Sequence, residues 1–147
     1  MIQNLFSGYV TCLGECLVTW KCKKQATVAL STCEAEVGAL LDLTKELKWL
    51  QGFLAELNEF GCLKYPLCVK TDSQSAISVI GNSNAHGRTK HFRRSYTFVK
   101  DEVERGNLKL VFVPSSENQA DVLTKNVHGV QMTDCMKTLN VKHVDVK

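Results

Sequence analysis

The 147-residue sequence contains no hydrophobic run long enough to cross a lipid bilayer. Its start, Met1-Ile2-Gln3-Asn4, lacks the pattern of a secretory signal peptide. It also has no internal repeat and no low-complexity tract. These absences argue against a transmembrane, secreted or repeat protein, and we expect an intracellular, cytoplasmic protein with no membrane partner.

Zinc-ligand spacing is missing as well. The seven cysteines form no C-x-x-C pair, and His86, His91 and Cys135 do not complete a zinc site. We therefore expect reduced thiols and no zinc. No local arrangement supports Ser/His/Asp or Cys/His nucleophilic catalysis.

The hydrophobic fraction of 44% is ordinary for a globular chain, and the net charge of +3 permits a nucleic-acid partner without requiring one.

Residues Ser31 to Leu57 are expected to form one long helix. Ser31 and Glu34 have the S-x-x-E spacing of a capping box, which starts a helix. One stripe of this helix begins with Glu36 and continues at alternating steps of four and three through Leu40, Leu43, Leu47, Leu50, Leu54 and Leu57. A glutamate on an apolar stripe is costly to bury unless a cation or hydrogen-bond donors meet it, so Glu36 is a candidate functional residue.

Strand and helix patterns alternate in the rest of the chain. We expect a hairpin over Gly8–Cys22 with its turn at Gly14-Glu15, and after the long helix a strand over Leu67–Thr71 and a helix from Ser73 to Gly81-Asn82. A helix ending at Arg105 and a strand over Leu108–Val113 are expected next. The last two expected elements are a helix starting at Ser116–Asn118 and a short helix containing Val130, Met132, Met136 and Leu139. This order predicts an α/β domain over residues 1–125 and a C-terminal tail over residues 126–147.

Three carboxylates occupy positions that suit a metal site. Glu36 lies on the stripe of the long helix, and Asp72 ends a strand at a strand-to-helix turn, where open α/β sheets bind ligands. Asp121 lies in the early turns of a later helix. If the three converge, they form an oxygen-rich cluster suited to Mg²⁺ or Mn²⁺ and to phosphodiester hydrolysis. The alternative is that Asp72 and Asp121 are ordinary helix-start acids, which are common, with Glu36 at the edge of solvent.

Several sequence blocks follow one another in a characteristic order. They are Ser7–Val10, Trp20–Gln25, Val28-Ala29-Leu30-Ser31-Thr32-Cys33-Glu34-Ala35-Glu36, Thr71-Asp72-Ser73-Gln74-Ser75-Ala76, His86-Gly87-Arg88-Thr89-Lys90-His91, and Phe112–Pro114 with Gln119–Lys125. The first two blocks resemble the opening hairpin of the RNase H domain of Ty1/copia-type retrotransposon Pol polyproteins. The other four resemble, in order, the ALST-x-EAEY, DNQSAI, H-x-RTKHI and QLADILTK motifs of this domain. The resemblance covers nearly all of Ser7 to Lys125.

The resemblance implies a fold, an activity and partners. The fold is an RNase H-like mixed five-stranded sheet flanked by helices. The activity is metal-dependent hydrolysis of the RNA strand of RNA/DNA hybrids with two Mg²⁺ or Mn²⁺ ions. The implied catalytic and metal-binding residues are Glu36, Asp72 and Asp121. The implied partners are the RNA/DNA hybrid and the reverse transcriptase domain of the parent polyprotein.

The sequence departs from the family pattern at its start. The family's first catalytic aspartate lies on the first, central strand, upstream of the block that resembles Ser7–Val10, and Met1–Phe6 contain no acid. We therefore expect a domain without this first strand and with weak or no activity. Val37 replaces the family's tyrosine, and Arg93 and Thr97 replace an acid and a histidine.

Basic residues form two groups that suit phosphate contacts. The candidates for nucleic-acid binding are Lys23, Lys24, Arg88, Lys90, Arg93 and Arg94. For any single residue, an ordinary solvated surface position is the alternative. Two functions other than catalysis remain open: a non-catalytic nucleic-acid-binding remnant, and a structural or interaction protein.

Overall fold

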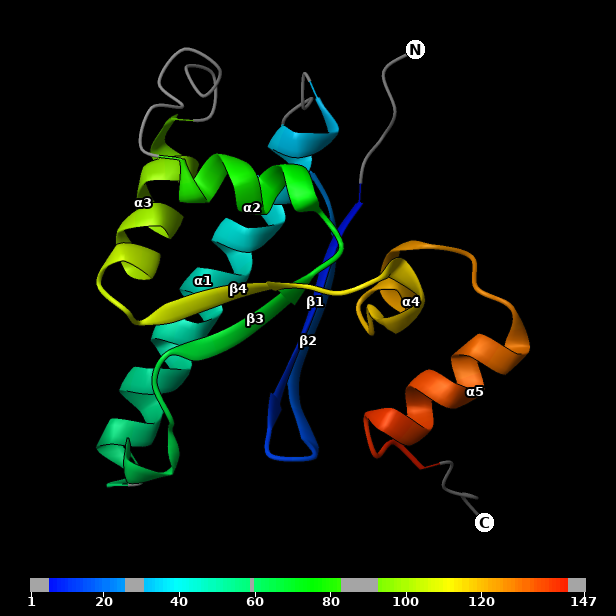
Figure 1. Ribbon diagram of the computed structural model, residues 1–147. Helices are drawn as coiled ribbons and strands as arrows, with labels where there is room; N and C mark the ends of the chain where they lie inside the picture. Colours follow the sequence, from blue (N-terminus) through cyan, green and yellow to red (C-terminus); the bar gives the residue numbers. More distant parts are fainter. Residues whose placement is uncertain (1–5, 26–30, 59, 83–92, 143–147) are drawn as a thin grey trace. The chain divides into compact units, whose positions relative to one another are not determined.

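The chain contains both strands and helices in the computed structural model, which describes residues 6–25, 31–58, 60–82 and 93–142 (Figure 1). The predictions for Arg88 and Lys90 lie outside these ranges. The described elements are β1 (Phe6–Leu13), β2 (Cys16–Lys24), α1 (Thr32–Glu56), η1 (Phe60–Cys62), β3 (Leu67–Thr71), α2 (Gln74–Gly81), α3 (Arg93–Glu104), β4 (Leu108–Phe112), η4 (Ser115–Glu117), α4 (Asp121–Thr124) and α5 (Gly129–Thr138). The mixed α/β class predicted from the sequence is confirmed.

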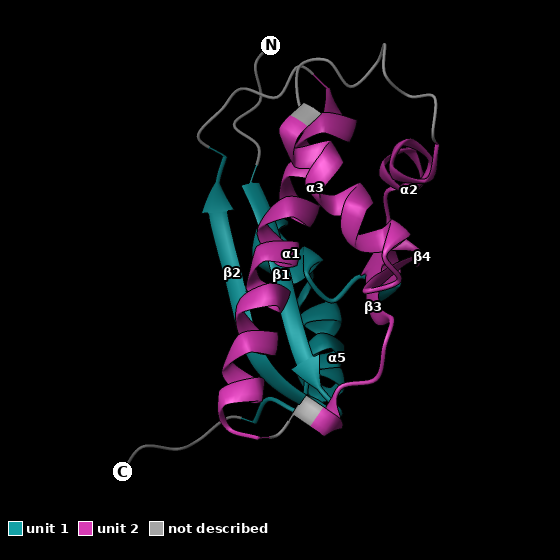
Figure 2. Ribbon diagram, turned by 90° about the vertical axis from the view of Figure 1, so that its left-hand side faces the viewer, with its two compact units in different colours: residues 1–28, 117–147 teal, residues 29–116 magenta. Residues whose placement is uncertain are grey.

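The chain divides into two compact units, residues 1–28 with 117–147 (unit 1) and residues 29–116 (unit 2) (Figure 2). Unit 1 contains β1, β2, α4 and α5, and unit 2 contains α1, α2, α3, β3 and β4. The described strands form two two-stranded sheets, β1 with β2 and β3 with β4. The RNase H-like five-stranded sheet and its missing first strand stay predictions. Among the described helices, none combines the length and apolar character that a membrane crossing requires.

The predicted hairpin is confirmed in unit 1. β1 and β2 pair antiparallel, with Val10 opposite Trp20 and Thr11 opposite Thr19. The two threonine hydroxyls lie 2.7 Å apart across the pair. Gly14 in the turn has a φ of 62°, a left-handed conformation that glycine adopts without steric cost.

The long helix α1 begins where the capping pattern predicts. Ser31 is the N-cap, and its hydroxyl accepts a hydrogen bond from the backbone N–H of Glu34 at 3.1 Å. The leucine stripe is confirmed in its first half: Leu40 is buried, and Leu43 and Leu47 pack against the core. The prediction is wrong for Leu57, the helix C-cap, whose side chain is 54% exposed.

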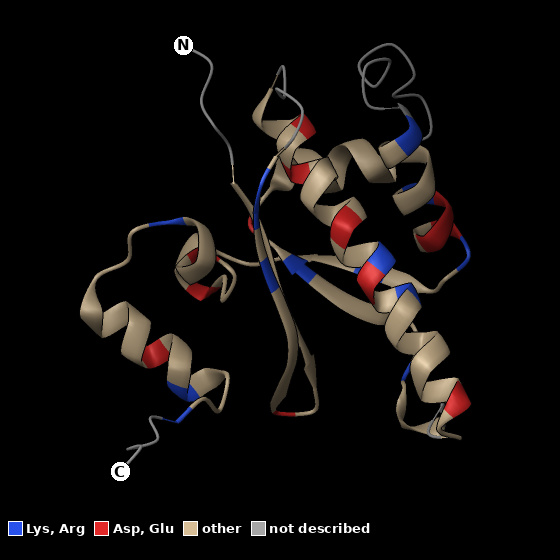
Figure 3. Cartoon of the chain, turned by 180° about the vertical axis from the view of Figure 1, so that it is seen from behind, with Lys and Arg blue, Asp and Glu red and all other residues tan. Residues whose placement is uncertain are grey.

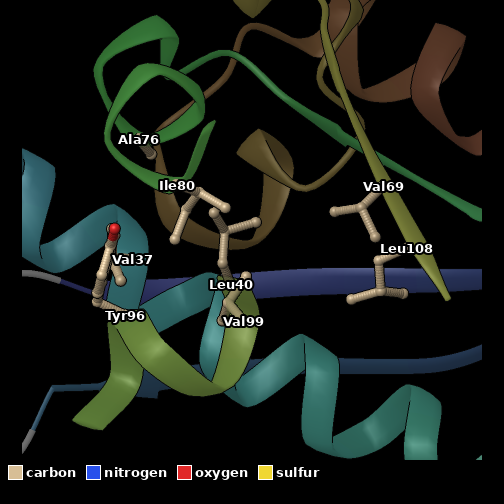
Figure 4. Close-up of a cluster of buried hydrophobic side chains, with 8 residues drawn as sticks. All are labelled: Val37, Leu40, Val69, Ala76, Ile80, Tyr96, Val99 and Leu108. Atoms are coloured by element: carbon tan, nitrogen blue, oxygen red, sulfur yellow. The ribbon is translucent and has the colours of Figure 1, made fainter. Parts of the chain in front are cut away.

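The core of unit 2 joins three helices to the parallel pair of β3 and β4. It consists of Val37 and Leu40 from α1, Val69 from β3, Ala76 and Ile80 from α2, Tyr96 and Val99 from α3, and Leu108 from β4 (Figure 4). Val37, rather than a leucine of the predicted stripe, is completely buried. The buried face of α1 is therefore centred on the residue beside Glu36, and Glu36 flanks it.

The segment after β4 differs from the prediction. A helix was expected to start at Ser116–Asn118, but the chain forms the single 3-10 turn η4 there, and the one-turn helix α4 begins at Asp121. A short helix does form in the tail, as α5, with its buried positions at Cys135 and Leu139.

None of the seven cysteines forms a disulfide; five of them are exposed and Cys135 is buried. Burial raises the pKa of the Cys135 thiol.

Among the described residues of unit 2, Glu102 is the buried acid. Lys48 of α1 donates to both of its carboxylate oxygens, at 3.3 and 3.2 Å, and Asn107 donates to Oε2 at 2.9 Å. Burial alone would raise the pKa of Glu102, but the hydrogen bonds from Asn107 and Lys48 and the charge of Lys48 lower it below its ordinary value. This cluster connects α1, α3 and the start of β4.

Truncation of Ile80, which is 2% exposed, should destabilise the protein. Ile80→Ala is expected to lower the free energy of unfolding by about 2–5 kcal/mol, because it leaves a cavity in the core. Leu57→Ala is the control and should change it by less than about 0.5 kcal/mol. Urea unfolding measures both, and equal losses would contradict the assigned core.

Replacement of Glu102 should have a pH-dependent cost. The pKa of Glu102 is lower in the folded protein than in the unfolded chain, where it is about 4.3. Its stabilising contribution is therefore present above that value and is lost as the pH falls through the folded pKa. Glu102→Gln should lower the melting temperature clearly at pH 7 and much less near pH 3. Glu104→Gln, on the exposed side of the same helix, should change little at either pH. A difference in melting temperature between wild type and Glu102→Gln that stays constant with pH would refute this role.

Candidate active site

Asp72 lies at the carboxyl end of β3, beside the residues that follow β4. The strands are parallel, with Thr71 opposite Phe112, and the backbone N–H of Val113 donates to the carbonyl of Thr71 at 2.9 Å. Just beyond this pair, the Ser115 hydroxyl donates to Oδ2 of Asp72 at 2.6 Å. Parallel pairing thus brings together two polar residues that are 43 positions apart in the sequence.

The turn after β3 holds Asp72 in place. The backbone N–H of Ser73 donates to the Thr71 hydroxyl at 3.2 Å, and the Ser73 hydroxyl accepts from the N–H of Ala76 at 3.2 Å. The N-cap of α2 is therefore Ser73 and not Asp72. Asp72 is partly buried and hydrogen-bonded to Ser115, and it directly precedes this N-cap, so its role as a metal ligand rather than a helix-start acid stays a prediction.

Glu36 is positioned by the first two turns of α1. Capping at Ser31 fixes the helix start, and the complete burial of Val37 fixes the rotation of the helix about its axis. Glu36 is partly buried beside Val37, at the border of the core. Both Glu36 and Asp72 belong to unit 2.

Asp121 belongs to unit 1 and is 6% exposed. Asn118 donates to its Oδ1 at 3.0 Å, and the Lys125 ammonium group donates to its Oδ2 at 2.6 Å. Asp121 is also the first residue of α4, whose N-cap Ala120 makes no side-chain hydrogen bond. Here the helix-start alternative fits, since the carboxylate lies at a helix N-terminus and is paired within the same turn.

The hairpin of unit 1 provides the surface on which α4 rests. The Cys22 thiol donates to the carbonyl of Leu123 at 2.9 Å. Gly8 allows close approach, because a Cβ atom there would lie 2.7 Å from Cγ2 of Thr124 and 3.3 Å from Cβ of Leu123. The absence of a side chain at Gly8 therefore decides where α4, and with it Asp121, can lie.

The three predicted acids are divided between the units, and their convergence stays a prediction. Within either unit, no three described Asp, Glu, His or Cys side chains gather in a metal-binding group.

Relatives of the chain are found among retrotransposon polyproteins. It is 40% identical over 121 residues to the Retrovirus-related Pol polyprotein from transposon TNT 1-94 of Nicotiana tabacum. It is 33% identical over 138 residues to the corresponding polyprotein from transposon RE1 of Arabidopsis thaliana, and 32% identical over 119 residues to the Transposon Ty1-DR1 Gag-Pol polyprotein of Saccharomyces cerevisiae. No family model and no solved structure matches the chain.

The chain is homologous to a segment of copia/Ty1 Pol polyproteins. The three matches cover 82%, 94% and 80% of the chain, but 9%, 9% and 7% of the length of the respective relatives. The retrotransposon part of the sequence-based interpretation is therefore confirmed.

The basic residues of this Pol-related chain lie in both units. Lys23 and Lys24 are exposed at the end of β2, Arg94 is exposed near the start of α3, and Arg93 is the first residue of α3. Their role in nucleic-acid binding stays a prediction.

Sequence reasoning did not identify the partners of the acids. Ser115 follows β4, and the carboxyl ends of neighbouring parallel strands lie at one edge of a sheet. The position of Ser115 near Asp72 could therefore have been predicted once β3 and β4 were taken as parallel neighbours. Asn118 and Lys125, three before and four after Asp121, were also missed.

A side chain at Gly8 should disturb the support of Asp121. Gly8→Ala is expected to lower the melting temperature, because the new methyl group would overlap Cγ2 of Thr124. Adding Thr124→Ser removes that methyl group and should restore part of the loss. Differential scanning calorimetry of the two variants and of Thr124→Ser alone tests this; no rescue in the double variant would contradict the contact.

Proposed function

We propose that this chain is the RNase H-type part of a copia-type Pol polyprotein and that Glu36, Asp72 and Asp121 are its metal-binding carboxylates. The observation that carries the proposal is the position of Asp72. It lies at the carboxyl edge of a parallel strand pair, and Ser73 rather than Asp72 caps the following helix. Ligands of open α/β sheets bind at such edges.

The donor atoms at the proposed site fit the proposed ions. Carboxylate oxygens are the preferred ligands of Mg²⁺ and Mn²⁺. The Ser115 hydroxyl donates to Oδ2 of Asp72 and so orients this carboxylate. Asn118 and Lys125 orient the carboxylate of Asp121 in the same way within unit 1.

In this proposal the chain's side chains position a phosphodiester of the RNA strand for hydrolysis. Bound Mg²⁺ or Mn²⁺ ions would supply an activated water and stabilise the leaving oxygen. The proposed substrate is an RNA/DNA hybrid, which proteins recognise mainly by shape and by backbone and 2′-hydroxyl contacts. The exposed Lys23, Lys24 and Arg94 are suited to contact its phosphates. The proposed protein partner is the reverse transcriptase domain of the same polyprotein.

Metal binding tests the carboxylates independently of turnover. In a Mn²⁺ titration of the purified chain, followed by electron paramagnetic resonance of free Mn²⁺, Asp72→Asn and Glu36→Gln should each weaken binding by about tenfold or more, because each removes a charged ligand. Ser115→Ala should weaken it less. Asp134→Asn, an exposed acid on α5, is the matched control. Mn²⁺ affinity that is unchanged in both Asp72→Asn and Glu36→Gln would refute the proposed site.

Cleavage is measured separately with a labelled RNA/DNA hybrid and Mn²⁺. Met1–Phe6 contain no counterpart of the family's first aspartate, so we expect little or no cleavage by this chain alone, although the metal should still bind. Rapid cleavage that Asp72→Asn abolishes would contradict the expected weakness and establish an enzyme. Hybrid binding with neither cleavage nor metal binding would favour the alternative of a non-catalytic nucleic-acid-binding remnant.

A further inference from the structure

The second half of α1 carries an exposed apolar surface. Trp49, Phe53 and the C-cap residue Leu57 follow one another at steps of four, and their side chains are 58%, 45% and 54% exposed. The rings of Trp49 and Phe53 stack with their centroids 5.5 Å apart. Leu47, which packs against the core, lies two residues before Trp49, and residues two apart point to nearly opposite sides of a helix. The apolar surface therefore lies on the side of α1 that faces away from the core of unit 2.

Four residues form a seam along this side of the helix: Lys45, Trp49, Gly52 and Glu56. All four are exposed, and their steps of four, three and four are those of the positions through which helices pair. A Cβ atom at Gly52 would meet nothing within 4 Å, so another chain can approach the backbone there. Residues 49–55 carry no charge (Figure 3). Within the described residues, neither Lys45 nor Glu56 takes part in an ion pair.

The seam is complementary to its own reverse. When a second copy of α1 lies antiparallel to the first, with a two-fold axis between positions 50 and 51, Lys45 of each copy faces Glu56 of the other. Trp49 then faces Gly52, so the largest side chain meets the position that has none. Two-fold symmetry makes each of these contacts twice. A parallel pairing would instead bring like charges together and place the two tryptophan rings against each other.

We propose that two copies of this chain associate through α1 in this antiparallel arrangement. The match of size and charge lies within one seam, which is the property that an isologous interface requires of its surface. The seam spans three helical turns, or about 16 Å, so the interface is small. We therefore expect a weak dimer with a dissociation constant of about 1–100 µM. The dimer needs neither a metal ion nor a nucleic acid, and it is distinct from the proposed hydrolysis.

Self-association is tested by analytical ultracentrifugation of the full chain in EDTA and a reducing agent, because metal ions or the exposed cysteines could otherwise link copies. The weight-average mass should rise with concentration from that of one chain toward that of two. Trp49→Ala should weaken association by about 30-fold or more, the loss expected at a central aromatic contact. Its melting temperature should stay near that of the wild type, because the side chain is largely exposed.

Replacement of Gly52 separates association from folding. Gly52→Gln should weaken the dimer by about tenfold or more, because the new side chain occupies the place of the Trp49 ring. The melting temperature of the dilute chain should not fall, since glutamine forms helices better than glycine and its Cβ has open space. Gly129→Gln is the matched control: Gly129 is exposed at the start of α5 and has equally open space, so association should be unchanged.

A charge exchange tests the antiparallel orientation. Lys45→Glu and Glu56→Lys should each weaken association by about 3- to 30-fold, because each replaces two attractive contacts by two repulsive ones. The double variant Lys45→Glu with Glu56→Lys restores opposite charges at both contacts and should dimerise as the wild type does. In a parallel pairing, neither single variant would change the number of like-charge contacts.

A mass that stays at one chain up to about 500 µM would overturn the proposal, because this concentration exceeds the expected dissociation constant. Association that persists unchanged in Trp49→Ala and Gly52→Gln would overturn it too, and a double charge variant as weak as the single ones would refute the antiparallel arrangement. Binding of another part of the Pol polyprotein at Trp49 by a chain that stays monomeric would assign this surface to that partner instead. Because EDTA is present, each result is independent of the Mn²⁺ and cleavage experiments.

Discussion

The parallel pairing of β3 with β4 is the constraint on which unit 2 depends. Parallel neighbours cannot be joined by a tight turn, so the chain between Thr71 and Leu108 must cross over the sheet. It does so through α2 and α3, and their apolar faces need a partner, which α1 provides. The buried Ile80 and Val99 of the crossover belong to the same core cluster as Val37 and Leu40 of α1 (Figure 4). The same pairing places Asp72 and Ser115 at one edge, so the core of unit 2 and the position of Asp72 follow from a single topological requirement.

A polar cluster completes this arrangement where the apolar core ends. Glu102 lies in the last turns of α3, Lys48 on α1, and Asn107 just before β4. Removing a carboxylate from water is costly, and this cost is offset because both oxygens have charged or amide donors. Within the described residues, every fully buried side-chain nitrogen or oxygen has a hydrogen-bond partner. The cluster therefore joins α1, the end of α3 and the residue before β4 through directional hydrogen bonds.

Local patterns predicted the elements well because local physics decides them. The capping serine at Ser31, the glycine turn at Gly14 and the strand over Leu67–Thr71 each have a short-range cause, and all three are confirmed. The burial of the long helix was predicted less well. A leucine stripe indicates which side of α1 is apolar, but it does not indicate where the neighbouring elements end, and Leu57 extends into solvent.

The candidate site shows the same division between local and long-range causes. Asp72 could be chosen from its place after a strand, whereas its bond to Ser115 depends on which strands are neighbours. The start of α4 was misplaced because Ser116–Asn118 have the composition of a helix start, yet the chain forms a 3-10 turn there. The exposure of Trp20 in β2, whose side chain is 62% exposed, was not predicted either, because a strand pattern does not indicate which face is covered.

The surroundings of Asp121 bear on how a metal ion could bind in the proposed site. Both of its oxygens are already engaged, Oδ2 by the ammonium group of Lys125 at 2.6 Å. A divalent ion at this carboxylate would have to compete with that ammonium group. The competition is a modest one, because the Lys125 side chain is 54% exposed and its charge can return to water on a flexible stem. In the proposal, Lys125 thus acts as the counter-charge that makes burial of Asp121 tolerable before a metal ion binds.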